Sequence, residues 1–427
     1  METKTESPPR DFDIVLFGAT GFTGRLVAER IAEHAASMGT LRWALAGRNP
    51  DKLAAVRDAV AAKFPGCAQL PLLTVDASDG AGLRAVARRT HVVCTTVGPY
   101  LRLGLPLATA CAEEGTDYCD LTGEVQFMHE NIARTQARAV QTGARIVHTC
   151  GFDSIPSDMG VRVLHDALAK QGKQLAAARL YVRSIKGGMS GGTLASILTL
   201  LEQAASDRNV RRMLADPLAL VPKNEGDSDQ SRAQRRSALR DPKKLSFDTE
   251  ARQWTIPFFM GVVNSRVVHR SNALLGHPYG RDFRYAEYVG LGAGPRGAVL
   301  GAAMMGGLGG FLLLGLNGVT RGWVSRLLPE AGTGPSPDVV QRGRWHLQIR
   351  GYVADMPQAA AVLSVRGQGD PGYGSTSRML TEVALLLAET AHTTDKVGGI
   401  QTPASALGMP LVPRLARAGV TFELQTP

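Results

Sequence analysis

The sequence predicts an α/β fold, in which a Rossmann-type doubly wound parallel sheet is joined to a second α/β domain. Near the start of the chain, an apolar run at residues 14–17 is followed by glycines at three-residue spacing and an amphipathic helical pattern. Strand and helix patterns then alternate in short units up to about residue 150, which is typical of parallel sheets. Two later strand patterns, 344–353 and 360–367, indicate paired strands of a second sheet.

The glycine turn in "DIVLFGATGFTGR" (residues 13–25) is the first candidate site. Gly18 permits a sharp turn, Gly21 lets backbone N–H groups approach a pyrophosphate, and Gly24 lets the helix pack closely on the strand. Thr20 stands where the usual fingerprint has glycine, so an ordinary glycine-rich turn is the alternative. The candidate cofactor-binding residues of this turn are Gly18, Thr20, Gly21, Phe22, Thr23 and Gly24.

The end of the second strand pattern indicates which dinucleotide binds. NAD sites usually carry an acidic residue about 20 residues after the turn, where it holds the ribose 2′-hydroxyl. Here the strand ends in Gly47, Arg48 and Asn49. A guanidinium can grip a 2′-phosphate with two hydrogen bonds, whereas a carboxylate would repel it. Arg48 therefore favours NADP over NAD, and a solvated arginine at a strand end is the alternative.

The ends of later strand patterns supply the other candidate cofactor contacts, because a doubly wound sheet binds its ligand over the carboxyl ends of its strands. Asp76 follows the third strand, where its carboxylate could meet the adenine amine. Thr122 could hold the carboxamide of the cofactor. The fourth strand leads into Gly98, Pro99 and Tyr100. The candidates from these loops are Asp76, Gly98, Pro99 and Thr122.

Composition limits the other function classes. With 427 residues and 44% hydrophobic content, the chain can bury two cores. Its five cysteines form no C-x-x-C pair and no zinc spacing, so we expect reduced thiols, a cytoplasmic location and no metal site. The net charge of +10 would suit nucleic acid, an anionic membrane or an acidic substrate. No nucleic-acid-binding motif accompanies it, so a nucleic-acid partner is not expected. A homo-oligomer stays open.

The patterns divide the chain into three parts. Residues 10–155 are expected to form the NADP-binding Rossmann domain, and residues 156–374 the substrate domain. Residues 222–250 are polar and lack apolar periodicity, so they predict a surface insertion within the substrate domain that is partly disordered. The last part, 375–427, predicts a helical segment that packs back on the first domain.

One apolar segment does not fit a plain cytoplasmic enzyme. Residues 297–320 contain 24 residues without a charge, long enough for a helix to cross a bilayer. Eight of them are glycines, however, and the pairs Gly306-Gly307 and Gly309-Gly310 predict a break at the centre. Three interpretations stay open: a hairpin that dips into a membrane surface, a glycine-packed internal helix pair, or a transmembrane helix. The first would place the protein peripherally on the inner face of the plasma membrane.

Several longer motifs carry a family resemblance. Together with the glycine turn, the chain contains "WALAGR", "TTVGPY", "GTDYCDLTGE", "CGFDSIPSD" and "GGIQTPASA", in order from residue 13 to about residue 406. In these motifs the sequence resembles the saccharopine dehydrogenase-like oxidoreductases, and within them the bacterial trans-acting enoyl reductases. The resemblance implies an NADP-binding Rossmann domain and a second α/β domain for the substrate. It also implies reduction of a carbon–carbon double bond in a lipid made by a polyketide synthase that lacks its own reductase.

Catalytic candidates follow from what enoyl reduction needs, namely a donor for the enolate oxygen and a proton source for the α-carbon. Tyr100 could serve as either, and Asp153 or Asp158 could orient a donor, although each residue type is also common in turns and caps. We select Tyr100 and Asp153. The expected substrate is a lipid or acyl thioester. The alternatives are a saccharopine-type amino-acid dehydrogenase, which needs cations such as Arg183 or Lys186 for its carboxylates, and a non-catalytic lipid-associated scaffold.

Overall fold

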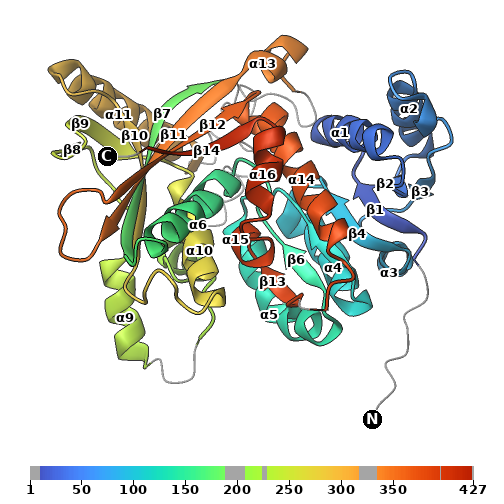
Figure 1. Cartoon of the computed structure of the whole chain (residues 1–427), viewed down its shortest axis with the longest axis horizontal. Helices are drawn as coiled ribbons and strands as arrows, with labels where there is room; N and C mark the ends of the chain where they lie inside the picture. Colours follow the sequence, from blue (N-terminus) through green and yellow to red (C-terminus); the bar gives the residue numbers. More distant parts are fainter. Residues whose placement is uncertain (1–9, 188–206, 224–227, 317–333, 395, 426–427) are drawn as a thin grey trace.

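The computed structural model describes residues 10–187, 207–223, 228–316, 334–394 and 396–425. Within these residues the chain forms two seven-stranded sheets, here called sheet A and sheet B. Figure 1 shows the sheets side by side, with the C-terminal helices between them. This arrangement makes the C-terminal part of the chain the link between the two sheets.

Sheet A is wholly parallel and has the strand order β13-β6-β5-β4-β1-β2-β3. The order reverses between β1 and β4, as in the usual Rossmann fold, and β13 extends the far edge. The predicted Rossmann-type sheet is therefore confirmed. Its strands are β1 (Phe12–Phe17), β2 (Trp43–Gly47), β3 (Leu72–Thr74), β4 (Thr90–Thr95), β5 (Asp117–Cys119), β6 (Arg145–Val147) and β13 (Gly399–Gln401).

Helices cover both faces of sheet A, since both faces of its strands are apolar. One face packs against α1, α2 and α14, and the other packs against α3, α4 and α5. Alternate residues of β1 divide accordingly, with Ile14 and Leu16 in the first core and Val15 and Phe17 in the second. The helices are α1 (Phe22–Met38), α2 (Pro50–Ala61), α3 (Gly80–Arg88), α4 (Tyr100–Glu114), α5 (Val125–Thr142) and α14 (Thr376–Glu389), with a short 3-10 turn, η1 (Pro65–Cys67).

Sheet B is mixed and has the order β14-β12-β11-β7-β10-β9-β8. The paired strands predicted at 344–353 and 360–367 are β11 and β12, which run antiparallel. Its strands are β7 (Leu175–Lys186), β8 (Ser246–Asp248), β9 (Gln253–Pro257), β10 (Arg284–Gly290), β11 (Arg344–Val353), β12 (Ala361–Gln368) and β14 (Val420–Gln425). The main helices beside it are α6 (Ile155–Ala169), α10 (Gly261–Leu274) and α11 (Pro295–Leu316).

The C-terminal segment belongs to both sheets. Helix α14 packs on α1 and on sheet A, β13 joins the edge of sheet A, and β14 joins the edge of sheet B. One hydrophobic cluster runs from the α1 face of sheet A through α14 and α6 to sheet B. This shared core holds the two sheets in a fixed relation. The shorter elements here are α13 (Pro337–Arg342), η2 (Pro371–Ser375), α15 (Pro403–Ala406) and α16 (Leu411–Arg417).

Two segments singled out in the sequence contain regular secondary structure where they are described. The polar stretch 222–250 contains a helix, α9 (Asp229–Ala238), and the strand β8, and another short helix, α8 (Arg208–Ala215), precedes it. Its Arg232 is buried and donates to the carbonyl of Leu218. In the apolar segment, α11 continues through the glycine pairs, so the predicted break is absent. Residues 317–320 lie outside the described residues. Among those described, no helix combines the length and hydropathy that a membrane span requires.

Candidate cofactor and active site

The glycine turn after β1 is held closed by backbone contacts at the switch point of sheet A. Gly18 has φ +90°, and its N–H donates to the carbonyl of Ala46 on β2 (2.9 Å). Its own carbonyl accepts from the Thr96 hydroxyl (3.1 Å) and the Gly21 N–H (3.1 Å). At Gly24, an added Cβ would lie 2.2 Å from the Gly18 carbonyl oxygen. Gly18 and Gly24 are thus required by the turn itself.

Gly21 has a different position, at the N-terminus of α1. Its φ of −72° is open to any residue, and an added Cβ would meet only the Gly18 carbonyl oxygen at 3.5 Å. Among the described residues, no side chain caps α1, so its first N–H groups are available to an anion. Thr20, Phe22 and Thr23 lie in or beside this turn and are half-buried. The cradle therefore fits the pyrophosphate of a dinucleotide.

Arg48 and Asp76 lie where the adenosine end of the cofactor would reach. Arg48 is exposed directly after β2, and Asn49 caps α2 through the Lys52 N–H (2.9 Å). The Asp76 carboxylate accepts from the hydroxyl (2.6 Å) and N–H (2.9 Å) of Ser78. These hydrogen bonds lower the pKa of Asp76, and the Arg48 guanidinium adds to the effect. Arg48 is thus free to meet a phosphate, while Asp76 is engaged by its own turn.

Asp120, at the end of β5, ties together the two loops that follow β5 and β6. Its side chain is buried, and Oδ1 accepts from the N–H groups of Thr122 (3.1 Å) and Thr149 (3.2 Å). Its backbone carbonyl accepts from the Cys150 N–H (2.7 Å). Thr149 has φ +61°, which is uncommon for a β-branched residue and often marks functional sites. This anchor fixes both loops over the carboxyl ends of sheet A.

The other oxygen of Asp120 meets His148. Oδ2 accepts from His148 Nδ1 (2.7 Å) and from the Tyr118 hydroxyl (2.9 Å). On the far side of the ring, His148 Nε2 lies 2.9 Å from Asn131 Nδ2, while Asn131 Oδ1 accepts from the Thr135 hydroxyl. The Asn131 amide is thus oriented to donate to Nε2 of His148, whose Nδ1 faces the Asp120 carboxylate. The sequence analysis did not select His148. Its only signal in the sequence is that it is a polar residue directly after an apolar strand.

Asp153 lies in the loop tied by Asp120 and is half-buried. Its Oδ1 lies 3.6 Å from the position that a Cβ on Gly123 would take, so the carboxyl group faces the loop after β5. Burial raises the pKa of Asp153 to about 7, its own N–H opposes the rise, and the negative charge of Asp120 adds to it. Near pH 7, the Asp153 carboxyl group is therefore protonated in a large fraction of the molecules, and it can donate that proton.

Three further candidate residues from the sequence, Tyr100, Thr122 and Asp158, have side chains that are engaged in hydrogen bonds within the protein. Tyr100 is buried at the start of α4, and its hydroxyl donates to the Thr95 carbonyl (3.3 Å). That hydroxyl would have to leave this bond to reach a substrate. The Thr122 hydroxyl accepts from the Glu124 N–H (3.1 Å), while Asp158 accepts from the Ser271 hydroxyl (2.5 Å). Gly98 is exposed and Pro99 half-buried between β4 and α4, so these two line the loop nearest the turn.

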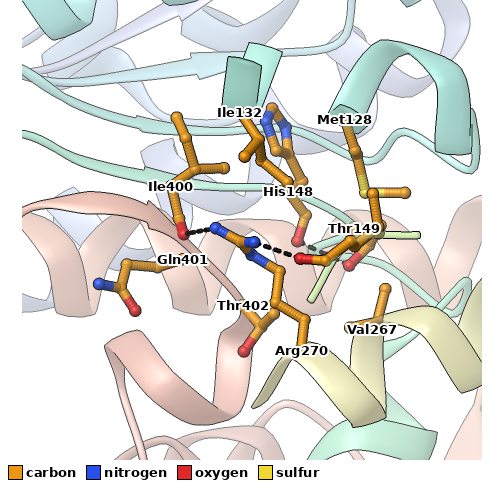
Figure 2. Close-up of a pocket in the computed structure, with 10 residues that line it drawn as sticks. Met128, Ile132, His148, Thr149, Val267, Arg270, Ile400, Gln401 and Thr402 are labelled. Carbon is orange, nitrogen blue, oxygen red and sulfur yellow. Dashed lines mark hydrogen bonds between the residues drawn. The ribbon is translucent and has the colours of Figure 1, made fainter. Parts of the chain in front are cut away.

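A small cavity is lined by His148 and Thr149 together with residues of α5, α10 and the segment around β13 (Figure 2). Its volume of about 10 Å³ is at the lower limit for one water molecule. Arg270 crosses it and donates to the carbonyls of Ile400 (2.6 Å) and Leu220. Among the described residues, no cluster of His, Cys, Asp or Glu could hold a metal ion.

Comparison with known proteins places this site in a family. The family described as the saccharopine dehydrogenase NADP binding domain matches residues 14–147. A Mycobacterium tuberculosis protein named "Putative trans-acting enoyl reductase" is 43% identical over 419 residues, 97% of this chain and 98% of that protein. The trans-acting enoyl reductase of Mycobacterium bovis is 40% identical, over 97% of each chain. The chain belongs to the saccharopine dehydrogenase-like oxidoreductases.

A solved structure agrees with this assignment at the level of the fold. Apo saccharopine dehydrogenase (L-Glu forming) from Saccharomyces cerevisiae matches with a TM-score of 0.51 and 12% identity, covering 97% of this chain and 99% of that one. As a saccharopine dehydrogenase-like oxidoreductase, the chain has NADP as its cofactor. The open cradle at Gly21 and the free guanidinium of Arg48 fit that cofactor.

We predict that Arg48→Asp removes the preference of this saccharopine dehydrogenase-like oxidoreductase for NADPH over NADH. The change deletes a charge-assisted contact worth about 1.5–3 kcal/mol, or roughly 10- to 150-fold in affinity, and adds repulsion of the 2′-phosphate. Titration calorimetry with both cofactors measures the effect. Arg84→Asp, on the exposed face of α3, makes the same charge change elsewhere and should leave the preference intact. Equal affinity of the unmodified protein for both cofactors would contradict the role of Arg48.

Proposed function

We propose that this protein is an NADPH-dependent enoyl reductase that acts on a lipid or acyl thioester. The observation that carries the proposal is the position of the Asp153 carboxyl group, which lies in a loop that Asp120 ties over the carboxyl ends of a Rossmann sheet. Burial raises the pKa of this group to about 7, which suits a proton donor. Enoyl reduction needs a proton at this place, because hydride addition to the β-carbon leaves an enolate that must be protonated at the α-carbon. The names of relatives at 40–43% identity support the same reaction.

The residues of the chain have separate tasks in this reaction. NADPH, when bound, supplies the hydride. The N–H groups at the start of α1 hold its pyrophosphate, and Arg48 holds its 2′-phosphate. Asp153 donates its proton to the α-carbon of the substrate, is left as a carboxylate, and regains a proton from solvent. Asp120 and His148 act as positioning residues, since they fix the loop that carries Asp153.

The second candidate is an amino-acid dehydrogenase of the saccharopine type, which the fold alone also accommodates. It would need cations for the substrate carboxylates. Arg183 is exposed and donates to Gln253 (2.9 Å), and Lys186 is also exposed. Oxidation of NADPH is therefore to be measured with a panel of enoyl thioesters and with 2-oxo acids plus lysine or glutamate. Turnover of the 2-oxo acids alone would overturn the enoyl reductase proposal. Turnover of neither substrate class would favour a non-catalytic, lipid-associated scaffold.

We also propose that α11 rests on an anionic membrane surface. Val299 and Leu300 are 70% and 50% exposed, while Gly301 on the opposite side of the helix packs against Leu245. Figure 1 shows α11 at the periphery, beside β8 and β9. Arg296 lies one helical turn before Val299 and Leu300 and is exposed, so a cationic group borders the apolar face. Apolar side chains flanked by a cationic residue are the usual composition of an interfacial anchor.

The protein is predicted to co-sediment with vesicles that contain phosphatidylserine, and Val299→Ser with Leu300→Ser should release most of it. The reason is the loss of two side chains, each worth about 1.5–3 kcal/mol when fully buried in an apolar phase. Val140→Ser with Val397→Ser changes two valines that are 55% and 71% exposed elsewhere, and should leave binding unchanged. Absence of the unmodified protein from the vesicle pellet would contradict this proposal without affecting the reductase.

A further inference from the structure

A cleft of about 460 Å³ lies at one end of sheet B, outside the site described above. It is formed where β7 ends, α13 ends, β11 begins and β12 ends. The residues that line it are Lys186, Gln341, Arg342, Gly343, Arg344 and Gln368. Three of the six are cations, and none is acidic.

Within the described part of the chain, the cations of this cleft have little compensation from acidic side chains. Lys186 and Arg344 lie directly opposite each other on antiparallel strands, an arrangement in which like charges destabilise a sheet. Among the described residues, neither has an ion-pair partner, and Arg342 has only Asp338 at 3.8 Å, with both side chains largely exposed. Asp370 lies beside Gly343, but its carboxylate is buried and accepts from the N–H groups of η2. The cleft therefore presents an unbalanced positive charge.

The cleft lies close to the loop of Asp153. Arg344 is followed by Trp345, whose ring contacts that of Phe152 (centroids 4.9 Å apart), the residue before Asp153. Trp345 Nε1 also donates to the Ser375 hydroxyl at the end of η2 (3.0 Å).

The same π-helical turn connects the cleft to the cofactor cradle. Tyr373 of η2 packs edge-on against Phe22, at the start of α1 (centroids 4.7 Å apart). The cleft is thus joined, through Trp345 and η2, to the loop of Asp153 and to the start of α1.

We propose that this cleft binds the phosphate of the pantetheine arm that carries the thioester substrate. The inference rests on the proposed reductase function and names the substrate more closely. Coenzyme A and the prosthetic arm of a carrier protein share a phosphate at one end of pantetheine and the thioester at the other. The phosphate would neutralise Lys186 and Arg344, while the arm leads the acyl group to Asp153. Arginine and lysine are the side chains that proteins use for such phosphates.

Kinetics with paired substrates test the proposal. The same enoyl group is presented on coenzyme A, on 4′-phosphopantetheine and on pantetheine without phosphate. In the double variant Lys186→Gln with Arg344→Gln, KM for the two phosphate-bearing substrates should rise about tenfold or more, with kcat and the KM for enoyl pantetheine unchanged. Lys170→Gln with Lys173→Gln, at the exposed end of α6, removes the same charge and should change none of these values. Equal effects on substrates with and without phosphate would overturn the proposal.

Direct binding separates this inference from the reductase proposal. Titration calorimetry with 4′-phosphopantetheine, in the presence of saturating NADP⁺, should show binding to the unmodified protein and a loss of about tenfold or more in the double variant. Equal binding of pantetheine, or equal binding by the variant, would overturn the cleft assignment even if enoyl thioesters are reduced. Phosphate-dependent binding without turnover of any enoyl thioester would instead support the cleft and overturn the reductase. A larger effect on coenzyme A than on phosphopantetheine would place its additional phosphates in the same cleft.

Discussion

Gly21→Val should abolish NADPH binding while leaving the fold intact. The backbone of Gly21 is extended (φ −72°, ψ 165°), a conformation that valine favours, and an added Cβ meets only the Gly18 carbonyl oxygen at 3.5 Å. The branched side chain would instead occupy the space over the start of α1, where the pyrophosphate must approach the N–H groups. We expect cofactor affinity to fall by more than about 100-fold, equivalent to roughly 2.7 kcal/mol.

The matched control is Gly24→Ala, three residues further along. There a Cβ would lie 2.2 Å from the Gly18 carbonyl oxygen and 2.9 Å from the Ala19 Cα, so the turn itself must open. This smaller change should lower the melting temperature, whereas Gly21→Val should not. Calorimetric cofactor titration and thermal unfolding of both variants check the pair. A Gly21→Val protein that binds NADPH normally would show that the pyrophosphate lies elsewhere.

The parts of the site that the sequence predicts are those formed by residues close in the chain. The turn from Gly18 to Gly24 is local, and so is the position of Arg48 after a strand. Asp120 and His148 are 28 residues apart, and their pairing depends on the register of β5 against β6. No local pattern contains that register, so the anchor of the Asp153 loop could not be predicted.

Competition between local and tertiary partners limits prediction in another place. Ser157 is of a residue type that commonly caps helices, yet α6 begins at Ile155, before it. The Ser157 hydroxyl donates to the buried carboxylate of Glu287 on β10 instead (2.7 Å). A carboxyl group 130 residues away in sequence is thus the hydrogen-bond partner of Ser157, in place of a backbone N–H of the adjacent helix. The split of the C-terminal segment between the two sheets has the same origin, because β13 and β14 each pair with strands far away in the chain.

The glycines of α11 show where propensity arguments fail. Each glycine costs a helix about 1 kcal/mol relative to alanine, and four of them at the centre predicted a break. The helix nevertheless runs from Pro295 to Leu316. At Gly301 a Cβ would lie 2.5 Å from Leu245, so one glycine of this segment serves close packing. For Gly306, Gly307, Gly309 and Gly310 no atom of the described residues lies within 4 Å of an added Cβ, so the described residues offer no packing reason for these glycines.

Asp153→Asn should reduce kcat for enoyl reduction by about 10²–10⁴-fold, the usual contribution of a general acid. The amide keeps the shape of the side chain but has no proton to donate. In the unmodified protein the pKa of about 7 predicts that kcat is level below pH 7 and falls above it, as Asp153 loses its proton. The variant should be slow at every pH, without that alkaline fall. Its affinity for NADPH should be unchanged.

Stability supplies an independent test, because the raised pKa of Asp153 means that the folded state binds this proton more tightly than the unfolded state. An ordinary aspartate titrates near pH 3.9, so the Asp153 contribution to stability is greatest at low pH and is lost as the pH rises from about 4 to about 7. Asparagine cannot ionise, so the variant should melt at a higher temperature than the unmodified protein above pH 7 while being nearly inactive.

Asp158→Asn is the comparison variant for both measurements, the pH dependence of kcat and the melting temperature. Burial raises the pKa of Asp158 to about 6, but its carboxylate accepts from the Ser271 hydroxyl and the Ala404 N–H (2.8 Å). Replacing it should destabilise the protein through those bonds and leave the alkaline fall of kcat in place. If Asp153→Asn retained normal activity, or if the fall above pH 7 persisted in it, another group would be the proton donor. Tyr100 would then be the next candidate, since its hydroxyl needs only to leave the Thr95 carbonyl.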